Sequence, residues 1–422
     1  MAKLINSPTV GSKLEVSHRS IPTVVAGVFF GGCGTFGVTF KRNNCRWLPA
    51  FEIDRRHGVG STVFSVISWM TSGIFGIALF AATSTPAFAQ DDDAFHYNRL
   101  LGRGINLGNA LDGPQEGVTL EADYFRLIKE AGFNSVRIPI RWSAHASATA
   151  PYDIEMGFFQ RVDWAIVQAL SRNLAAVINV HHYEEMNQDP VQNLPRLVEL
   201  WKQIARRYQH QPKSLMFELL NEPHGRLNDE RWQEAFPQLL KAIRDSNPDR
   251  IILIGPAYLN AIDRLDKIEL PPQDRRIIGT FHYYKPLQFT HQGASWINDS
   301  APWRGTRWTA TPQEREELRK DFERAAAWSH QNHRPLYVGE FGAYREANLD
   351  DRALWTRAVA GEAEKRGFSW SYWEFCSAFG AYDPAVQRWR RPLLNALLDK
   401  DRRHSAIRAS SSTVQPRNHT PR

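Results

Sequence analysis

The sequence predicts an α/β protein that forms a single (β/α)8 (TIM) barrel. From residue 100 onward, eight short β-rich runs alternate with longer amphipathic stretches, the pattern expected when parallel strands alternate with helices. Several of the runs are apolar throughout, as in strands buried on both faces. A doubly wound sheet would fit the alternation too. However, the segment 108–112 after the first run, Gly-Asn-Ala-Leu-Asp, is not the glycine-rich phosphate turn of that fold.

The expected elements follow one another without an internal repeat. The expected strands are residues 104–107, 135–140, 175–180, 215–219, 251–254, 278–283, 336–341 and 369–375. The expected helices are residues 120–131, 156–172, 194–209, 229–245, 312–330, 350–366 and, at the end of the barrel, 391–398. The connection around residues 261–268 has the weakest helical pattern.

Composition and charge exclude few classes of function. The chain has 422 residues, 42% hydrophobic and 23% charged, which is ordinary for a globular protein. Its net charge is +7, but residues 1–89 hold 8 Lys/Arg and 3 Asp/Glu, a net of +5 that leaves only +2 for the rest. The basic excess belongs largely to the leader, so nucleic-acid binding is not indicated.

The cysteines indicate neither a disulfide framework nor a metal site. Cys33 and Cys45 lie in the leader, so the rest of the chain keeps only Cys376, which we expect to be a small buried residue. No Cys/His spacing resembles a zinc site. We therefore expect no metal and no cofactor.

The N-terminal segment has the features of an export signal. Residues 57–90 carry no Asp, Glu, Lys or Arg, residues 63–82 are strongly apolar, and Ala87-Phe88-Ala89 forms a small-x-small site. This predicts cleavage after Ala89 and a secreted or periplasmic protein. The alternative is a membrane anchor through residues 63–82, which are nearly enough to span a bilayer.

The chain thus divides into three parts. Residues 1–89 form the leader, whose first 54 residues are either a disordered extension or an over-long start. Residues 90–400 form the catalytic barrel, and the polar, basic tail 401–422 is expected to be disordered.

Polar and aromatic groups stand where nearly every expected strand ends. A barrel enzyme works at the C-terminal ends of its strands, so their convergence on one face indicates a site. In strand order these residues are Asn106 and Asn109, Arg137, His181 and His182, Asn221 and Glu222, His282 and Tyr284, Glu340, and Trp373 and Glu374.

Two of these groups are carboxylates on the fourth and seventh strands. Glycosidic cleavage needs one protonated carboxyl for the leaving oxygen and one ionised carboxylate at the anomeric carbon. Retaining enzymes hold the two carboxyls roughly 5 Å apart. Glu222 and Glu340 face the same narrow barrel mouth and suit this chemistry.

Six segments, in order along the chain, resemble glycoside hydrolase family 5 between about residues 98 and 400. They are VRIP at 136–139, VHHYEE at 180–185, ELLNEP at 218–223, TFHYY at 280–284, VGEFG at 338–342 and YWEF at 372–375. The resemblance implies a retaining barrel glycosidase with its acid and its nucleophile on strands four and seven. The match of six ordered segments is more specific than any one motif.

The resemblance also implies the role of each matching residue. Glu222 is implied as the general acid/base and Glu340 as the nucleophile. Arg137 lies near the nucleophile, where a fixed cation favours its ionised form. The remaining implied residues are Asn221, for the sugar 2-hydroxyl, His181, lining the cleft, His282 and Tyr284, supporting the carboxylates, and Trp373, a sugar platform. No metal or cofactor is required.

Several residues near the site keep more than one interpretation. Trp142 is a further candidate cleft aromatic. Glu218 is expected to be paired inside the barrel, and Glu374 to contact either sugar or a basic neighbour. Because His181 and His182 are adjacent on a strand, their side chains face opposite ways, and we expect only His181 to face the cleft. For His182, a core histidine and a residue outside the core remain equal interpretations. No role is assigned to the remaining candidates, Glu184, Glu185, Trp296, Trp303 and Trp308.

The expected function is therefore endo-acting, retaining hydrolysis of β-1,4-glucosidic bonds, as in a cellulase. The alternatives are a β-mannanase or another β-glycanase on the same scaffold, and a barrel that binds glycan without cleaving it. We expect a monomer whose partner is a β-glucan polysaccharide or oligosaccharide, with no nucleic acid and no stable membrane partner once the signal is cleaved. Digestion of plant polymer and trimming of the cell's own glucan fit the sequence equally.

Overall fold

The computed structural model describes residues 94–113 and 117–398. The predicted leader 1–89, its cleavage site after Ala89, its apolar run 63–82 and the tail 401–422 lie outside these residues. Within the described ranges, no helix is both long enough and apolar enough to cross a membrane.

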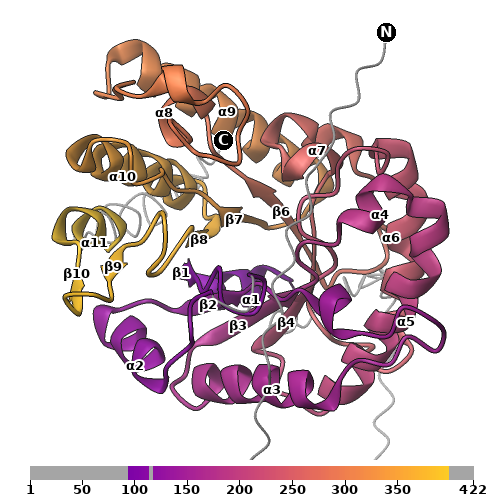
Figure 1. Cartoon of the computed structure of the whole chain (residues 1–422). Coiled ribbons are helices and arrows are strands. Elements are labelled where there is room, and N and C mark those ends of the chain that lie inside the picture. The colour runs from indigo at the N-terminus through magenta and orange to yellow at the C-terminus, as the bar shows by residue number, and fades with distance from the viewer. Residues whose placement is uncertain (1–93, 114–116, 399–422) are drawn as a thin grey trace, which may run out of the picture. The chain divides into compact units, whose positions relative to one another are not determined.

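Eight parallel strands close into a barrel in sequence order, so the predicted (β/α)8 architecture is confirmed (Figure 1). The first strand pairs with both the second and the eighth, which closes the ring. The strands are β1 (Arg103–Asn106), β2 (Ser135–Ile138), β3 (Ala175–Asn179), β4 (Leu215–Glu218), β5 (Ile252–Ile254), β6 (Ile277–His282), β7 (Leu336–Glu340) and β8 (Ser369–Tyr372).

The outer helices occupy the predicted stretches, with shifted ends. They are α2 (Ala122–Ala131), α3 (Met156–Leu170), α5 (Pro190–Tyr208), α6 (Asp229–Arg244), α9 (Pro312–Asn332), α10 (Leu349–Lys365) and α11 (Arg391–Leu397). The weak connection at 261–268 contains a 3-10 helix, Ile262–Lys267, instead of an α-helix. Elements that the sequence pattern did not indicate are α1 (Ala94–Leu101), α4 (Glu184–Gln188), α7 (Ala257–Asn260), α8 (Leu287–Thr290), and the hairpin of β9 (Tyr382–Asp383) and β10 (Arg388–Trp389).

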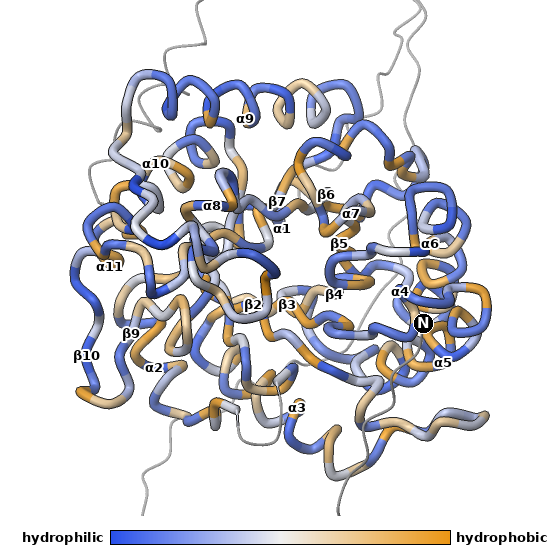
Figure 2. The backbone as a smooth tube through the Cα atoms, turned by 45° about the horizontal axis from the view of Figure 1, so that its top comes forward, coloured by the Kyte–Doolittle hydropathy of each residue, from blue (hydrophilic) through white to orange (hydrophobic). Residues whose placement is uncertain are grey.

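Capping residues set where two of the helices begin. Helix α5 starts four residues before the predicted position because Pro190 occupies its first turn and the Asp189 side chain accepts a hydrogen bond from the Gln192 N–H. Helix α9 begins with a reciprocal capping box between Thr311 and Glu314. Helix α9 is drawn mostly in blue in Figure 2, as expected for a helix with a broad solvent face.

Helix α1 closes the N-terminal end of the barrel. It runs directly into β1, and its Asn98 accepts a hydrogen bond from Ser369, the first residue of β8, at 2.5 Å. The buried α1 residues Ala94, Tyr97 and Leu101 form one apolar cluster with Ile251, which precedes β5, and with side chains of the strands, Ala175, Val177, Met216, Leu253, Ile278 and Tyr337. This end of the barrel is therefore filled with packed apolar groups.

The larger core lies between the strands and the ring of helices. It includes Ile138 of β2, Val162 of α3 and Trp201 of α5, all fully buried. At the opposite end of the barrel from α1, the inner residues are polar, beginning with the buried Asn106, Arg137 and Glu218. The apolar layers thus leave the C-terminal mouth of the barrel for polar chemistry.

Candidate active site

The two carboxylates predicted to carry the chemistry meet at the C-terminal mouth of the barrel. Glu340 is the last residue of β7, and Glu222 follows β4 by four residues. One carboxylate oxygen of each, and a ring nitrogen of His282, all lie within 4.8 Å of one another. This separation is close to that of retaining glycosidases and leaves less room than inverting enzymes need for a water between the carboxyls.

Arg137 is the centre of the network beneath these carboxylates. Its side chain is fully buried and makes a two-pronged ion pair with Glu218, at 2.6 and 2.9 Å. The same guanidinium donates to Glu340 Oε1 at 2.7 Å, and to the amide oxygens of Asn106 and Asn221. The prediction that Glu218 is a paired barrel residue is therefore confirmed. A bidentate pair of this kind fixes the guanidinium and, through it, Glu340.

Glu340 is held from two sides. Arg137 donates to Oε1, and the Tyr284 hydroxyl donates to Oε2 at 2.9 Å. Burial and the neighbouring charges of Glu340 and Glu222 hold the pKa of Tyr284 well above its usual value, so the phenol keeps its proton as a donor. The carboxylate is thus oriented through both of its oxygens.

Glu222 forms a pair with His282. The distance from His282 Nδ1 to Glu222 Oε1 is 2.7 Å. Burial opposes ionisation of both groups, but it is outweighed. The hydrogen bond to His282 and the charge of that ring lower the pKa of Glu222, whereas the charge of Glu340, followed by the hydrogen bond to Glu222, raises the pKa of His282. The pair therefore retains one proton in the acid-to-neutral range, and we describe it as a unit.

The backbone at Glu222 is strained. Its φ is 50°, in the left-handed region that residues other than glycine seldom adopt. The preceding residue, Asn221, uses its Oδ1 to accept from Arg137 at 2.7 Å. This leaves the amide nitrogen of Asn221 as the part of the side chain that can donate to a sugar hydroxyl.

Trp373 forms one wall of the mouth together with His181. Their rings are parallel, at an interplanar angle of 3° and a centroid separation of 5.8 Å. Trp373 is partly exposed, and it needs a glycine opposite, because a Cβ on Gly108 would lie 2.6 Å from the indole. Burial lowers the pKa of His181 well below its usual value, so this ring is neutral.

The segment 180–182 differs from the predicted arrangement. Strand β3 ends at Asn179, and His182 has a φ of 47°, so the alternation of a strand does not apply there. The Nε2 atoms of His181 and His182 both lie 3.9 Å from Asp112 Oδ2. His182 is exposed, which excludes the interpretation as a core histidine.

Asp112 was not singled out from the sequence. It is 1% exposed, and its Oδ2 has no hydrogen-bond partner among the described residues. Burial raises its pKa, although backbone N–H groups and the His182 charge oppose the shift. Only the loop conformation after β1 brings this carboxyl to the two histidines.

Two clusters in the described part of the chain bring three potential metal ligands together: Glu222, His282 and Glu340, and Asp112, His181 and His182. In the second, the amide nitrogen of Asn179 lies 3.2 Å from His181 Nδ1. An amide N–H there places the proton of the neutral ring on Nε2, which then faces Asp112 as a donor. This arrangement suits a hydroxyl-bearing ligand better than a metal ion.

A profile of the cellulase family, glycosyl hydrolase family 5, matches residues 103–379, which include every strand of the barrel. The chain belongs to glycosyl hydrolase family 5.

The chain is similar to several members of this family. It is 36% identical to Endoglucanase H of Acetivibrio thermocellus over 329 residues, 75% of this chain but 35% of that protein. It is 49% identical to Thermotoga maritima Cel5A, solved with cellobiose and with mannotriose; each comparison has a TM-score of 0.71 and covers 72% of this chain and 100% of that one. The cellulose synthase subunit Z of Clostridioides difficile is 38% identical, with a TM-score of 0.69 and coverage of 71% and 99%. The chain thus spans about a third of the length of Endoglucanase H.

The prediction that Trp142 lines the cleft of this family 5 site is wrong. Its side chain is fully buried and packs against Phe158 and Phe159 of α3. Its indole N–H donates to the Asn179 carbonyl at 3.0 Å. Trp142 therefore supports the end of β3 from behind and offers no face to a sugar.

Glu374 has a role that neither of its two interpretations anticipated. It is fully buried, and its carboxylate accepts backbone N–H groups of Cys376, Ser377 and Phe379 at 2.8–3.0 Å. Burial nevertheless raises its pKa to about 7. Glu374 thus anchors the loop after β8, and Cys376 in that loop is buried as predicted.

The three tryptophans after β6 have different environments. Trp308 is 2% exposed and belongs to the core, whereas Trp296 is 53% exposed. Trp296 lies against Tyr344 and Phe379, and its centroid is 6.3 Å from that of His291, which contacts Tyr284. Trp303 is partly exposed. Of the three, Trp296 has the exposure and position of a cleft aromatic.

His224 is a further residue that the sequence pattern did not indicate. Its Nδ1 lies 2.7 Å from the carbonyl oxygen of Glu222, and its Nε2 lies 3.5 Å from Glu184. His224 therefore braces the strained backbone of the acid/base residue, and Glu184 braces His224. The only sequence signal was its place in the segment after Pro223.

Proposed function

We propose that the protein hydrolyses β-1,4-glucosidic bonds within β-glucan chains, with retention of the anomeric configuration. The observation that carries the proposal is the approach of the Glu222 and Glu340 carboxylates to within 4.8 Å, across a mouth lined by Trp373. Endoglucanase H and the Cel5A complex with cellobiose support a β-glucan as substrate.

The contacts assign each group a step. Glu222 protonates the leaving oxygen while Glu340, held by Arg137 and Tyr284, attacks the anomeric carbon. The glycosidic C–O bond breaks, the shortened chain leaves with the proton, and a glycosyl ester forms on Glu340. Glu222, now ionised, takes a proton from water, which attacks the anomeric carbon and releases Glu340. Two inversions give net retention.

Incubation with defined polymers tests this proposal. The purified full chain is mixed separately with carboxymethyl-cellulose, barley β-glucan and galactomannan, and the reducing ends released are measured beside Glu340→Gln. Release from the two glucans, lost in the variant, is expected, and the first product detected by NMR is the β-anomer. An α-anomer would overturn the retaining mechanism. Release from galactomannan alone would make the protein a mannanase, and Cel5A has been solved with mannotriose.

We also propose that the protein is exported with cleavage after Ala89 and acts as a monomer. The uncharged segment 57–90 and the small-x-small site at 87–89 support export. Expression of the full chain in a bacterial host, followed by N-terminal sequencing, should give an exported protein that begins at Gln90. An intact N-terminus in the membrane fraction would favour the anchor at residues 63–82. Light scattering on the cleaved protein should give one chain per particle.

A further inference from the structure

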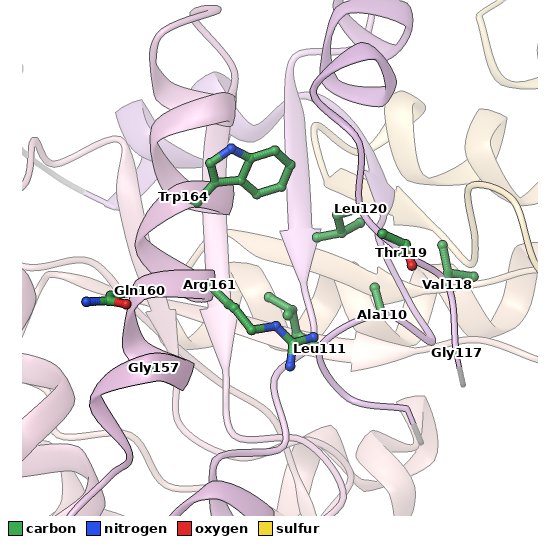
Figure 3. Close-up of a pocket in the computed structure, with 10 residues that line it drawn as sticks. All are labelled: Ala110, Leu111, Gly117, Val118, Thr119, Leu120, Gly157, Gln160, Arg161 and Trp164. Atoms are coloured by element: carbon green, nitrogen blue, oxygen red, sulfur yellow. The ribbon is translucent and has the colours of Figure 1, made fainter. Parts of the chain in front are cut away.

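A groove lies outside the catalytic mouth, between α3 and the described residues 110–111 and 117–120 of the segment that leads from β1 to α2 (Figure 3). Its volume is about 390 Å³. Arg161 and Trp164 project into it from α3, opposite Val118 and Leu120 of the segment, with Leu111 beneath. The groove is therefore walled by residues far apart in the sequence.

The helix residues that line the groove form a face separate from the core. Gly157, Arg161 and Trp164 recur at intervals of three and four residues, so they lie along one side of α3. The core-facing side of the same helix carries other residues, among them Val162 and Ile166. Trp164 is 38% exposed and lines the groove, so part of its ring is accessible to a ligand there.

The groove combines the two features with which proteins bind sugars. The indole of Trp164 offers a flat apolar face, and its contact with the buried Phe125, at 86° and 5.9 Å, holds the ring in place. Arg161 supplies N–H donors; its guanidinium lies 5.7 Å from the Phe158 ring centroid, and among the described residues it makes no ion pair with a carboxylate. One cation beside an aromatic suits a neutral, hydroxyl-rich chain. A nucleic acid would need a larger basic surface.

The groove and the catalytic mouth share a wall. Asp112 turns toward His181 and His182 at the mouth, whereas its neighbour Leu111 lines the groove. Leu111 is also tied to the barrel, because it forms a parallel bridge with Ile140. The groove and the mouth are therefore bordered by the same short piece of backbone, Leu111-Asp112.

We propose that this groove, the Trp164 groove, is a second binding site for β-glucan, engaged by chains long enough to extend from the catalytic mouth into the groove. The inference rests on the proposed function, which supplies the glycan. It adds a site away from both carboxylates, where occupancy raises the affinity for polymer without changing the chemistry at Glu222 and Glu340.

Two variants of the full chain test the groove in different ways. Trp164→Ala removes the aromatic face. Gly157→Leu fills the groove and leaves the tryptophan in place; apart from the adjacent residues and the backbone of α3, no atom lies within 4 Å of a Cβ added at Gly157, so this change should not disturb the fold. Val167→Ala is the matched control, since Val167 is 53% exposed on the same helix and does not line the groove.

The measurement is KM and kcat on barley β-glucan and on cellotetraose. Both groove variants should raise KM for the polymer about three- to tenfold, as expected for the loss of one aromatic contact, and leave kcat and all tetraose values unchanged. Val167→Ala should resemble the parent. An unchanged polymer KM in both variants would overturn the inference, and so would an equal rise for tetraose.

A binding measurement separates this inference from the proposed function. Glu340→Gln, alone and combined with Trp164→Ala, is run in native gels that contain barley β-glucan. Retardation of the single variant that the double variant loses would support the groove even if the parent cleaved no glucan. Equal retardation of the two variants, with an active parent, would overturn the groove and leave the proposed function intact.

Discussion

The two ends of the barrel are built from the same eight strands but hold opposite kinds of side chain. At the N-terminal end, helix α1 covers an apolar cluster that includes Leu101, Met216 and Tyr337. At the C-terminal mouth, the fully buried Arg137 is bound to Glu218 and Glu340. Two ends so different within one barrel indicate a division of labour, in which one end stabilises the fold and the other performs the chemistry.

The division is not complete, because the charged network is itself buried. Glu218 has no exposed surface, and Arg137 is its ion-pair partner. Removing one member of such a pair leaves an uncompensated charge in the interior. The mouth is therefore expected to affect both activity and stability, whereas the α1 end should affect stability alone. Variants at the two ends can test this asymmetry.

The largest expected effect is on turnover. Glu340→Gln removes the nucleophile and should lower kcat on β-glucan by roughly 10⁴-fold or more. The amide can still accept from Arg137, so the free energy of unfolding should change by less than about 1 kcal/mol. Reducing-sugar release and urea unfolding measure the two quantities. A loss of several kcal/mol in stability would show that Glu340 holds the fold together and would weaken the division between the ends.

The next largest expected effect is on both stability and activity. Arg137→Met leaves Glu218 buried without its partner and should destabilise the protein by about 3–5 kcal/mol, with loss of activity. The matched variant Arg137→Met/Glu218→Met removes both charges, so it should recover much of the stability and none of the activity. Urea unfolding of both variants measures the free energies of unfolding that test this expectation. Equal destabilisation in the single and double variants would mean that packing, and not charge, sets the cost.

At the other end, Leu101→Ala should destabilise without affecting catalysis. Leu101 is fully buried in the α1 cluster, so the truncation should cost about 2–5 kcal/mol. We expect kcat and KM on β-glucan to remain within twofold of the parent at a temperature where both proteins are folded. A large fall in kcat would show that the two ends are coupled through the strands.

Sequence patterns predicted the two ends with unequal success. The strand-end motifs gave Glu222, Glu340, Arg137 and Tyr284, because each is a polar group within or just after an apolar run that forms a barrel strand. Helix α1 was not predicted, because its eight residues are too few to show a clear helical period. The helix is stabilised by the apolar cluster that it forms with the strands. At this end, tertiary packing determines that the helix forms, and the local sequence pattern gives little indication of that packing.

The same distinction explains the errors at the mouth. A tryptophan near a strand end can equally well stack on a sugar or support the strand from the core. Only the packing of α3 against Trp142 shows that this residue belongs to the core. His182 was judged by strand alternation, but β3 had already ended at Asn179. Asp112 and His224 act through loop geometry, which no periodicity describes.

The Glu222–His282 pair predicts a smaller effect, in the pH dependence. The pKa of His282 is raised, so the pair loses its last proton above the usual histidine value of 6.5. In His282→Gln, Glu222 alone must hold the proton, and its ordinary pKa is 4.5. The alkaline limb of the kcat/KM profile on β-glucan should therefore move to lower pH. An unmoved limb would mean that another group sets it.

Stability should report the same pair. His282 contributes stability that is complete below 6.5 and is lost as the pH rises through its raised folded pKa. Glu222 contributes stability that is complete above 4.5 and is lost as the pH falls through its lowered folded pKa. The contribution of the pair is thus complete between about 4.5 and 6.5. His282→Gln should lose most stability in that window, as urea unfolding across pH would show.

The smallest effect concerns the rim of the mouth, which is not part of the charged network. Trp296 is 53% exposed beside Tyr344 and Phe379, so its removal should cost binding and little else. Trp296→Ala should raise KM for both β-glucan and cellotetraose about three- to tenfold, with kcat nearly unchanged. A rise for the polymer alone would match the behaviour expected of the Trp164 groove. The paired substrates therefore distinguish an aromatic inside the cleft from one in the Trp164 groove.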